Sequence, residues 1–254
     1  MPAANCPKCE GTGYVIVERD SLSGAVRCDC VDPGRSSRIM DSAAIPPLYA
    51  NAGFDTFSIP RENPIAYRDM MEIFLAVRGY AREFPGGKKP GILLMGDPGT
   101  GKTHLAVAAF RQLLAKGFEG RFFDYQNLLD RIRMGYDQAS NSSDKEAYRE
   151  AMDADILLLD DLGAHRVTDW VEDTVTSIIT YRCNNRKALI ATTNLIDGDA
   201  GYSTHEKSVS GKVDYRTTLT ERIGPRARSR LFEMCRIVKM PLVEDYRLRR
   251  QGVS

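Results

Sequence analysis

Short apolar runs and stretches of helical apolar spacing alternate along the chain from residue 67 onward. A continuous run of four or five apolar residues is typical of a buried parallel strand, whereas apolar residues three and four positions apart predict an amphipathic helix. Strands are expected at residues 91–95, 120–125, 155–161, 188–193 and 236–240. Helices are expected at residues 67–84, 104–114, 171–181 and 218–231, with another through Leu128, Leu129 and Ile132. This alternation predicts an α/β fold, with a doubly wound central parallel sheet flanked by helices.

Three polar stretches interrupt the pattern. Residues 31–60 are rich in Pro, Ser and Arg with scattered aromatic residues, and they are interpreted as a linker that docks onto the following domain. Residues 135–145 are expected to be a mobile polar segment, and residues 197–215 a long surface loop. The chain is therefore divided into a small N-terminal module at residues 1–45 and a larger α/β domain at residues 46–254.

A phosphate-binding loop is predicted between the first expected strand of the larger domain and its helix. Residues 96–103 read Gly-Asp-Pro-Gly-Thr-Gly-Lys-Thr and match the pattern G-x-x-x-x-G-K-[ST]. In such a loop the backbone N–H groups surround phosphate oxygens, the lysine reaches the β- and γ-phosphates, and the hydroxyl binds Mg²⁺. Lys102 and Thr103 are the corresponding residues. The full set expected to bind ATP is Gly96, Asp97, Pro98, Gly99, Thr100, Gly101, Lys102, Thr103 and His104.

Two acids end the most apolar strand. Asp160 and Asp161 follow Ile-Leu-Leu-Leu at residues 156–159, and ligands bind at the carboxyl ends of the strands in open parallel sheets. Asp160 is expected to hold Mg²⁺ together with Thr103, and Asp161 to act as the base that activates water. Asn194, which follows another apolar strand, is a candidate to orient that water or to sense the γ-phosphate.

Four of the six cysteines lie near the N-terminus. Cys6 and Cys9 form a C-x-x-C pair, and Cys28 and Cys30 form a C-x-C pair after an apolar run at residues 14–17 that favours a strand. Four thiolates suit a tetrahedral Zn²⁺ site that would stabilise a segment too short to build its own core. Reduced structural or redox-active thiols are the alternative. The remaining cysteines, Cys183 and Cys235, are expected to be buried small side chains.

Composition is that of an ordinary globular protein. The chain has 254 residues, 43% hydrophobic residues and a net charge of +1. No apolar stretch is long enough for a membrane span and the N-terminus lacks a signal-peptide pattern, so a cytoplasmic location without membrane contact is expected. Charge is uneven, because residues 221–254 contain nine Lys or Arg against four Asp or Glu. A local basic surface and an ordinary solvated helix face both fit that imbalance.

Taken together, these motifs resemble the DnaC/IstB-type AAA+ ATPases, which include bacterial and phage helicase loaders and ATPase helpers of transposases. The resemblance is carried by residues 51–57, 96–104, 156–163, 168–170, 192–195 and 226–235. It implies a P-loop NTPase core without a full helical lid domain, preceded by a zinc-ribbon-like module. It further implies that Asn194 is the sensor residue and that Arg226, with Arg230 second, supplies charge to ATP in a neighbouring subunit. Asp161 departs from the glutamate usual in AAA+ proteins, although aspartate also occurs in this family.

The resemblance implies an ATP-hydrolysing protein that assembles into an ATP-dependent homo-oligomer and acts in DNA replication as a helicase loader or nucleoprotein remodeler. Its partner would be a replicative helicase, and single-stranded DNA would be gripped by Tyr125, Arg131 and Arg133 and by a loop at His165 and Arg166. A transposase helper acting on duplex DNA is the alternative within the family. A small-molecule kinase, or a nucleotide-gated binding module with negligible turnover, is the alternative from another class.

Overall fold

The computed structural model describes residues 6–19, 22–28, 30, 31, 34–59, 63–135, 142–198, 205–207, 213–215, 217–241, 243 and 246. Its larger part is built on one five-stranded sheet in which every neighbouring pair of strands is parallel. The strands follow the spatial order β4 (Gly120–Asp124), β5 (Ile156–Asp160), β6 (Ala188–Thr193), β3 (Gly91–Met95) and β9 (Cys235–Lys239). The predicted α/β fold and all five predicted strands are confirmed. Because β6 lies between β3 and β5, its carboxyl end reaches both the phosphate-loop strand and the acidic strand.

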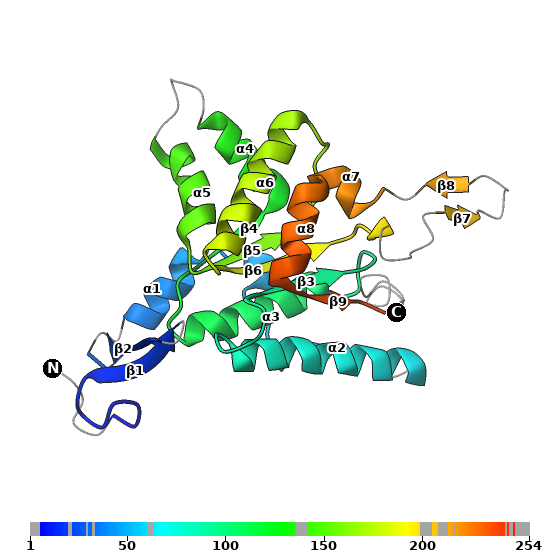
Figure 1. Cartoon of the computed structure of the whole chain (residues 1–254). Coiled ribbons are helices and arrows are strands. Elements are labelled where there is room, and N and C mark those ends of the chain that lie inside the picture. The colour runs from blue at the N-terminus through cyan, green and yellow to red at the C-terminus, as the bar shows by residue number, and fades with distance from the viewer. Residues whose placement is uncertain are drawn as a thin grey trace.

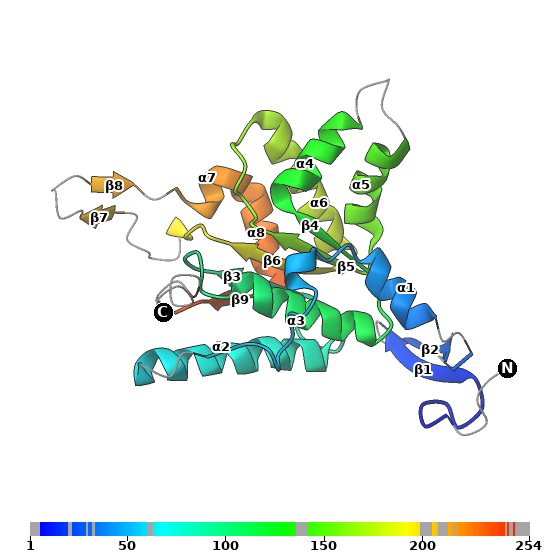
Figure 2. The same ribbon diagram turned by 180° about the vertical axis from the view of Figure 1, so that it is seen from behind.

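Helices cover both faces of this sheet (Figure 1). The helices are α1 (Arg35–Ser42), α2 (Pro64–Glu83), α3 (Lys102–Ala115), α4 (Tyr125–Met134), α5 (Ser142–Asp153), α6 (Asp169–Asn184), α7 (Leu219–Ile223) and α8 (Pro225–Met234). One core is shared by the sheet with α1, α2 and α3, and the other by the sheet with α4 to α8. The view from behind shows α2 and α3 below the sheet and α4, α5 and α6 above it (Figure 2).

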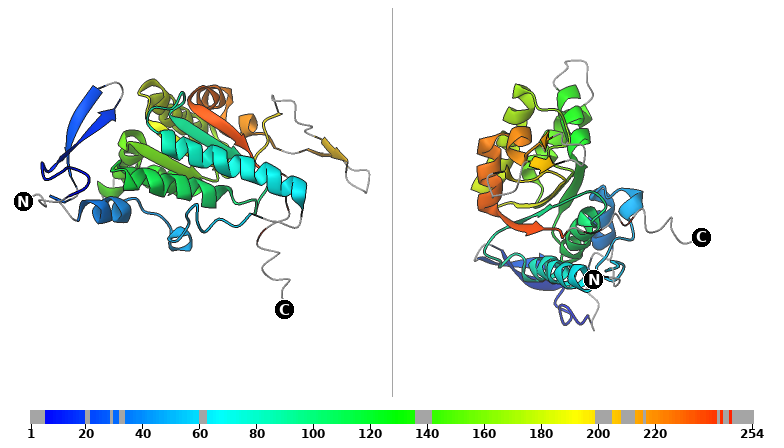
Figure 3. Two further views of the ribbon diagram at one scale, coloured as in Figure 1. Left: turned by 90° about the horizontal axis from the view of Figure 1, so that it is seen from below. Right: turned by 90° about the vertical axis from the view of Figure 1, so that its right-hand side faces the viewer.

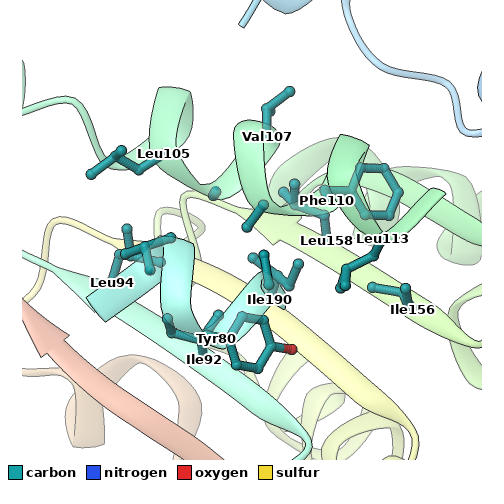
Figure 4. Close-up of a cluster of buried hydrophobic side chains, with 14 of the residues drawn as sticks. Tyr80, Ile92, Leu94, Leu105, Val107, Phe110, Leu113, Ile156, Leu158 and Ile190 are labelled. Atoms are coloured by element: carbon teal, nitrogen blue, oxygen red, sulfur yellow. The ribbon is translucent and has the colours of Figure 1, made fainter. Parts of the chain in front are cut away.

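Side-chain alternation along the strands explains the two cores. Ile92 and Leu94 of β3 face the core under α3, whereas Leu93 and Met95 face the opposite core. All five residues of β3 and all five of β5 are buried, as expected for central parallel strands covered on both faces. Figure 4 shows the α3 side of this packing, with Leu94, Phe110 and Ile190 among the labelled side chains.

Capping residues set the starts of several helices. The Asn63 side chain accepts hydrogen bonds from the backbone N–H groups of Ile65 and Ala66, with Pro64 in the first turn of α2. The Asp124 and Thr168 side chains cap α4 and α6 in the same way. Among the described residues, no helix is both long and apolar enough to span a membrane.

The N-terminal module is a small hairpin. Strands β1 (Tyr14–Arg19) and β2 (Leu22–Arg27) pair antiparallel, and they lie at one end of the molecule in the left view of Figure 3. The following segment is not purely a linker, since it contains α1 and a 3₁₀ turn at Pro47–Tyr49. Its docking onto the larger domain is confirmed: Ile39 and Ala43 are buried in the core under α3, and the Ala43 carbonyl accepts a hydrogen bond from Phe122 N–H.

Three other expectations need correction. Residues 142–145, expected to be part of a polar mobile segment, begin α5, while residues 136–141 lie outside the described residues. The expected long loop begins with a fully buried residue, Asp197, and contains the short antiparallel strands β7 (His205–Lys207) and β8 (Val213–Tyr215). The helix expected at residues 218–231 is two helices, because Gly224 and Pro225 break it.

Candidate nucleotide site

The predicted phosphate loop connects β3 to α3, the order that the motif requires. All three of its glycines have a positive φ, and at two of them a Cβ would also meet a close neighbour. Gly96 has φ 151°, and a Cβ there would lie 2.7 Å from the Met240 Cβ; Gly101 has φ 92°, and a Cβ there would lie 2.7 Å from a ring carbon of Phe57. The loop is therefore packed between the segment that follows β9 and the segment that precedes α2, with its shape fixed by close contacts on both sides.

Polar contacts inside the loop bring its functional side chains together. The Lys102 ammonium group and the Thr100 hydroxyl each donate to the Asp97 carbonyl, both at 2.8 Å. The N–H of Gly96 donates to the Thr193 carbonyl at 3.2 Å, which ties the loop to the end of β6. Lys102 is 5% exposed and begins α3, so its ammonium group lies near the positive end of the helix dipole. A bound anion would compensate both the ammonium charge and the dipole.

The Thr103 hydroxyl and the Asp160 carboxylate meet across the site. The hydroxyl donates to Asp160 Oδ1 at 2.9 Å, as the sequence predicts for two groups that share one metal ion. Burial raises the pKa of Asp160, against the opposing effect of hydrogen bonds from Thr192 and Thr103. A hard cation prefers oxygen ligands of this kind, and the positive charge of the cation would stabilise the buried carboxylate in its ionised form. The two residues therefore fit Mg²⁺.

The second acid adjoins the predicted sensor. Asp161 has φ 54°, a left-handed conformation that is strained for most residues, and its Oδ1 accepts a hydrogen bond from Asn194 Nδ2 at 3.1 Å. The sequence places these two residues 33 positions apart, and the adjacency of β5 and β6 brings them together. Asp161 is half-buried and Asn194 exposed, so both can reach a molecule bound above the sheet edge.

His104 has a different immediate role from the other loop residues. Its Nε2 lies 2.9 Å from the Gly53 carbonyl and 3.3 Å from the Thr56 hydroxyl. Its ring packs against Phe57 with centroids 5.3 Å apart. The imidazole thus links α3 to the segment at residues 53–57, which lies directly beside the phosphate loop.

Helix α8 presents its arginines in two directions. Arg226 and Arg230 are exposed and line a groove of about 690 Å³ together with Thr176, Thr180, Pro225 and Ser229. Their i, i+4 spacing places them on one face, as predicted. Arg228 lies on another face, where it makes two hydrogen bonds to the carboxylate of Asp197, at 2.9 and 2.8 Å, and its guanidinium lies over the Phe232 ring.

The four N-terminal cysteines form a compact cluster whose Sγ atoms all lie within 4.8 Å of one another. The Sγ atoms of Cys6 and Cys28 are 3.6 Å apart, and those of Cys9 and Cys30 are 3.5 Å apart. Thiolates around a tetrahedral Zn²⁺ lie about 3.8 Å apart, given a Zn–S distance of about 2.3 Å. Hydrogen bonds from the backbone of Lys8 and Cys9 lower the pKa of Cys6 to about 7, which favours the thiolate that a metal requires. The donor set and its spacing fit zinc.

The residues expected to grip DNA are not equally available. Tyr125 is 1% exposed, so its ring cannot stack on a base, and that expectation is wrong. The Arg131 guanidinium lies over the Phe123 ring at 5.5 Å, and the exposed Arg133 lies over the Trp170 ring at 4.8 Å. In the second expected DNA contact, Nδ1 of the half-buried His165 lies 2.7 Å from the carbonyl of the exposed Arg166.

Thr192 is a residue of this site to which sequence reasoning gives no role. It is fully buried, and its hydroxyl donates to Asp160 Oδ1 at 2.6 Å. Its position two residues before Asn194, on a strand next to the acidic strand, is the signal that points to it.

Comparison with known proteins decides the family. Residues 87–208 match the family described as IstB-like ATP binding protein. The crystal structure of the DnaC helicase loader superimposes with a TM-score of 0.60 and 30% sequence identity, over 77% of this chain and 100% of that one. The chain belongs to the DnaC/IstB-type AAA+ ATP-binding family. This DnaC/IstB-type protein is also 23% identical to the replicative helicase loader DnaC of Escherichia coli K12 over 198 residues, which are 76% of the chain and 77% of that protein. It is 25% identical to the phage-like element PBSX protein XkdC of Bacillus subtilis over 238 residues, or 91% and 79% of the two proteins.

Proposed function

We propose that this family member is an ATPase that loads a replicative helicase onto DNA or remodels a comparable nucleoprotein complex. The observation that carries the proposal is the pairing of Thr103 with Asp160 beside the pairing of Asn194 with Asp161, where α3 begins and the neighbouring strands β5 and β6 end in a DnaC-like fold. A protein that only bound nucleotide would need the first pair but not the second. The second pair supplies a base and its orienting group where attacking water must lie.

In this proposal the phosphate loop and Lys102 bind the triphosphate of ATP, and Thr103 and Asp160 hold Mg²⁺. The ion, when bound, neutralises charge on the β- and γ-phosphates. Asp161 accepts a proton from the attacking water, and Asn194 fixes the carboxylate that does so. Lys102 would exchange its contact with the Asp97 carbonyl for the phosphate oxygens, because an anion binds an ammonium group more strongly than a neutral carbonyl does.

Arg226 and Arg230 would complete the site of a neighbouring subunit. Both guanidiniums are exposed on α8 and line the groove with α6, as a contact made in trans requires. Such an arginine stabilises charge on the transferring phosphoryl group and makes hydrolysis depend on assembly. We therefore expect an ATP-dependent homo-oligomer.

The cysteine module would bind Zn²⁺ and dock a partner protein or DNA, since no acid–base pair adjoins the described thiols. Exposed Tyr14 and Ile16 on β1 offer it a contact surface.

Single-stranded DNA would be held through Arg131, Arg133 and the loop at His165 and Arg166. The cytoplasm is the proposed location, because the proposed partners act on replicating DNA.

The experiment that tests this function is steady-state ATP turnover against protein concentration, with and without single-stranded DNA, with Lys102→Ala as the inactive control. The proposal expects turnover per subunit to rise with concentration and to respond to DNA. Turnover that is independent of both would contradict it and would favour a small-molecule kinase acting as a monomer.

A transposase helper is the second candidate, and the match of residues 87–208 to the IstB-like family favours it. The same ATPase site would then serve a transposase on duplex target DNA. Stimulation of turnover by duplex but not by single-stranded DNA would favour this candidate over the helicase loader.

A further inference from the structure

Thr192 joins both acids of the nucleotide site through one hydroxyl group. The hydroxyl donates to Asp160 Oδ1 at 2.6 Å and accepts the backbone N–H of Asp161 at 3.0 Å. The carbonyl of the same threonine accepts the backbone N–H of Leu162 at 2.8 Å. Thr192 therefore contacts three consecutive residues of the neighbouring segment, from the carboxylate at the end of β5 to the turn that follows it.

The chemistry of the site requires a side chain that both donates and accepts. A carboxylate only accepts and a backbone N–H only donates, so a hydroxyl is the smallest group that satisfies both at one position. Thr192 is 0% exposed, and water cannot replace it easily. The N–H that it accepts belongs to Asp161, whose backbone has the strained φ of 54°.

The next residue provides a contrast. Thr193 is also fully buried on β6, but its hydroxyl donates to the Leu162 carbonyl at 2.7 Å and accepts the Leu195 N–H at 3.2 Å. It makes two hydrogen bonds of similar quality without touching either acid. The Thr193 hydroxyl therefore has a structural role alone, whereas the Thr192 hydroxyl contacts the two acids.

We propose that Thr192 is a positioning residue that orients the Asp160 carboxylate toward Mg²⁺ and holds Asp161 in the conformation in which its side chain faces Asn194. This inference rests on the proposed function, in which ATP binds together with Mg²⁺. Thr103 and Thr192 donate to the same oxygen of Asp160. If the Thr103 hydroxyl were to bind a metal ion instead, Thr192 would remain as the hydroxyl that fixes the carboxylate.

The test compares Thr192→Val, Thr192→Ser and Thr193→Val in the full-length chain. Affinity for a fluorescent ATP analogue is measured in EDTA and then against Mg²⁺ concentration, alongside ATP turnover. For Thr192→Val we expect unchanged affinity in EDTA, an apparent Mg²⁺ affinity about 10- to 100-fold weaker and a lower kcat. Thr192→Ser keeps the hydroxyl, and its apparent Mg²⁺ affinity should stay within about threefold of the wild type.

Thr193→Val is the matched control and should lower thermal stability while keeping the Mg²⁺ dependence of the wild type. Wild-type Mg²⁺ dependence in Thr192→Val, or an equal loss in both valine variants, would overturn the inference. If Thr192→Val does not fold, Thr192→Ala in the same titration decides. Asp160→Asn separates the two hypotheses: if the wild type binds no nucleotide or Asp160→Asn keeps full Mg²⁺ dependence, the proposed function itself has failed.

Discussion

Asn194 Nδ2 donates a hydrogen bond to Asp161 Oδ1 at 3.1 Å, and this contact joins the ends of two neighbouring strands. Asp161 lies in a left-handed turn after β5, and a second point of attachment restricts the rotation of its carboxylate. The amide of Asn194, which directly follows β6, supplies that attachment. The sensor and the base of the proposed mechanism are therefore in direct contact.

This contact predicts that the two residues act on turnover and not on binding. Asp161→Asn should lower kcat by about 100-fold or more, because it removes the group that accepts the proton of water. Asn194→Ala should lower kcat by about tenfold or more with unchanged ATP affinity. Single-turnover hydrolysis and equilibrium binding measure the two effects separately. Asn185→Ala, which removes an exposed amide bonded to the Tyr181 carbonyl, is the control and should match the wild type.

Asp160 should destabilise the protein when no metal is bound. Burial raises its pKa, so folding takes up a proton between the ordinary pKa and the raised one, and stability falls as pH rises through that window. In EDTA, Asp160→Asn should have a higher free energy of unfolding than the wild type near pH 8. The amide oxygen can accept both threonine hydroxyls that now bond to Oδ1.

The difference between the two proteins should close as the pH falls below about 3, under the ordinary pKa of an aspartate, where the wild-type carboxyl is protonated in both states. Urea denaturation across this pH range measures it. A variant that is less stable than the wild type at every pH would show that the carboxylate is compensated within the metal-free protein.

The ion pair between Arg228 and Asp197 should matter for stability. Asp197 is fully buried, so Arg228→Ala leaves its carboxylate without its guanidinium partner and also removes the contact with Phe232. We expect a loss of about 3 kcal/mol in the free energy of unfolding. Glu233→Ala removes an exposed pair with Arg230 at 2.7 Å and should cost less than about 1 kcal/mol. Equal losses in the two variants, measured by urea denaturation, would contradict this assignment.

Zinc should bind to the four cysteines of the N-terminal module. We expect an equimolar amount of zinc in the purified chain by elemental analysis, and Cys9→Ser should lower it because this variant lacks one of the four clustered thiolates. Chelation should expose the module to protease while the thermal transition of the larger domain stays unchanged, since the cysteine cluster is separate from both main cores. Cys183→Ser is the control. Undiminished zinc in Cys9→Ser would contradict the four-cysteine site.

Strong local signals explain what the sequence could predict. The five apolar strands and the phosphate loop have short, unambiguous patterns, and parallel strand ends necessarily meet at one edge of the sheet. Thr103 and Asp160 therefore meet as their motifs predict. The spacing of Arg226, Arg228 and Arg230 on a helix likewise predicts which two arginines share a face.

The elements that sequence reasoning missed depend on tertiary contacts. Helix α5 buries Ala147 and Ala151, whose small side chains give little apolar signal in a polar segment. Strand β2 contains Ser23 and Gly24, which favour turns, and it is a strand because it pairs with β1. Tyr125 is an aromatic residue of the type that stacks on DNA bases, but it is the first residue of α4, directly after β4, and its ring is buried.

Mixing two inactive variants tests the central claim, that ATP is hydrolysed at an interface between subunits of this chain. Arg226→Ala keeps its own nucleotide site but lacks the arginine, whereas Lys102→Ala keeps the arginine but lacks the site. Each alone should be inactive, and the mixture should recover ATP turnover, because the arginine of one subunit completes the site of the other. A mixture that stays inactive, or an Arg226→Ala protein as active as the wild type, would contradict the account.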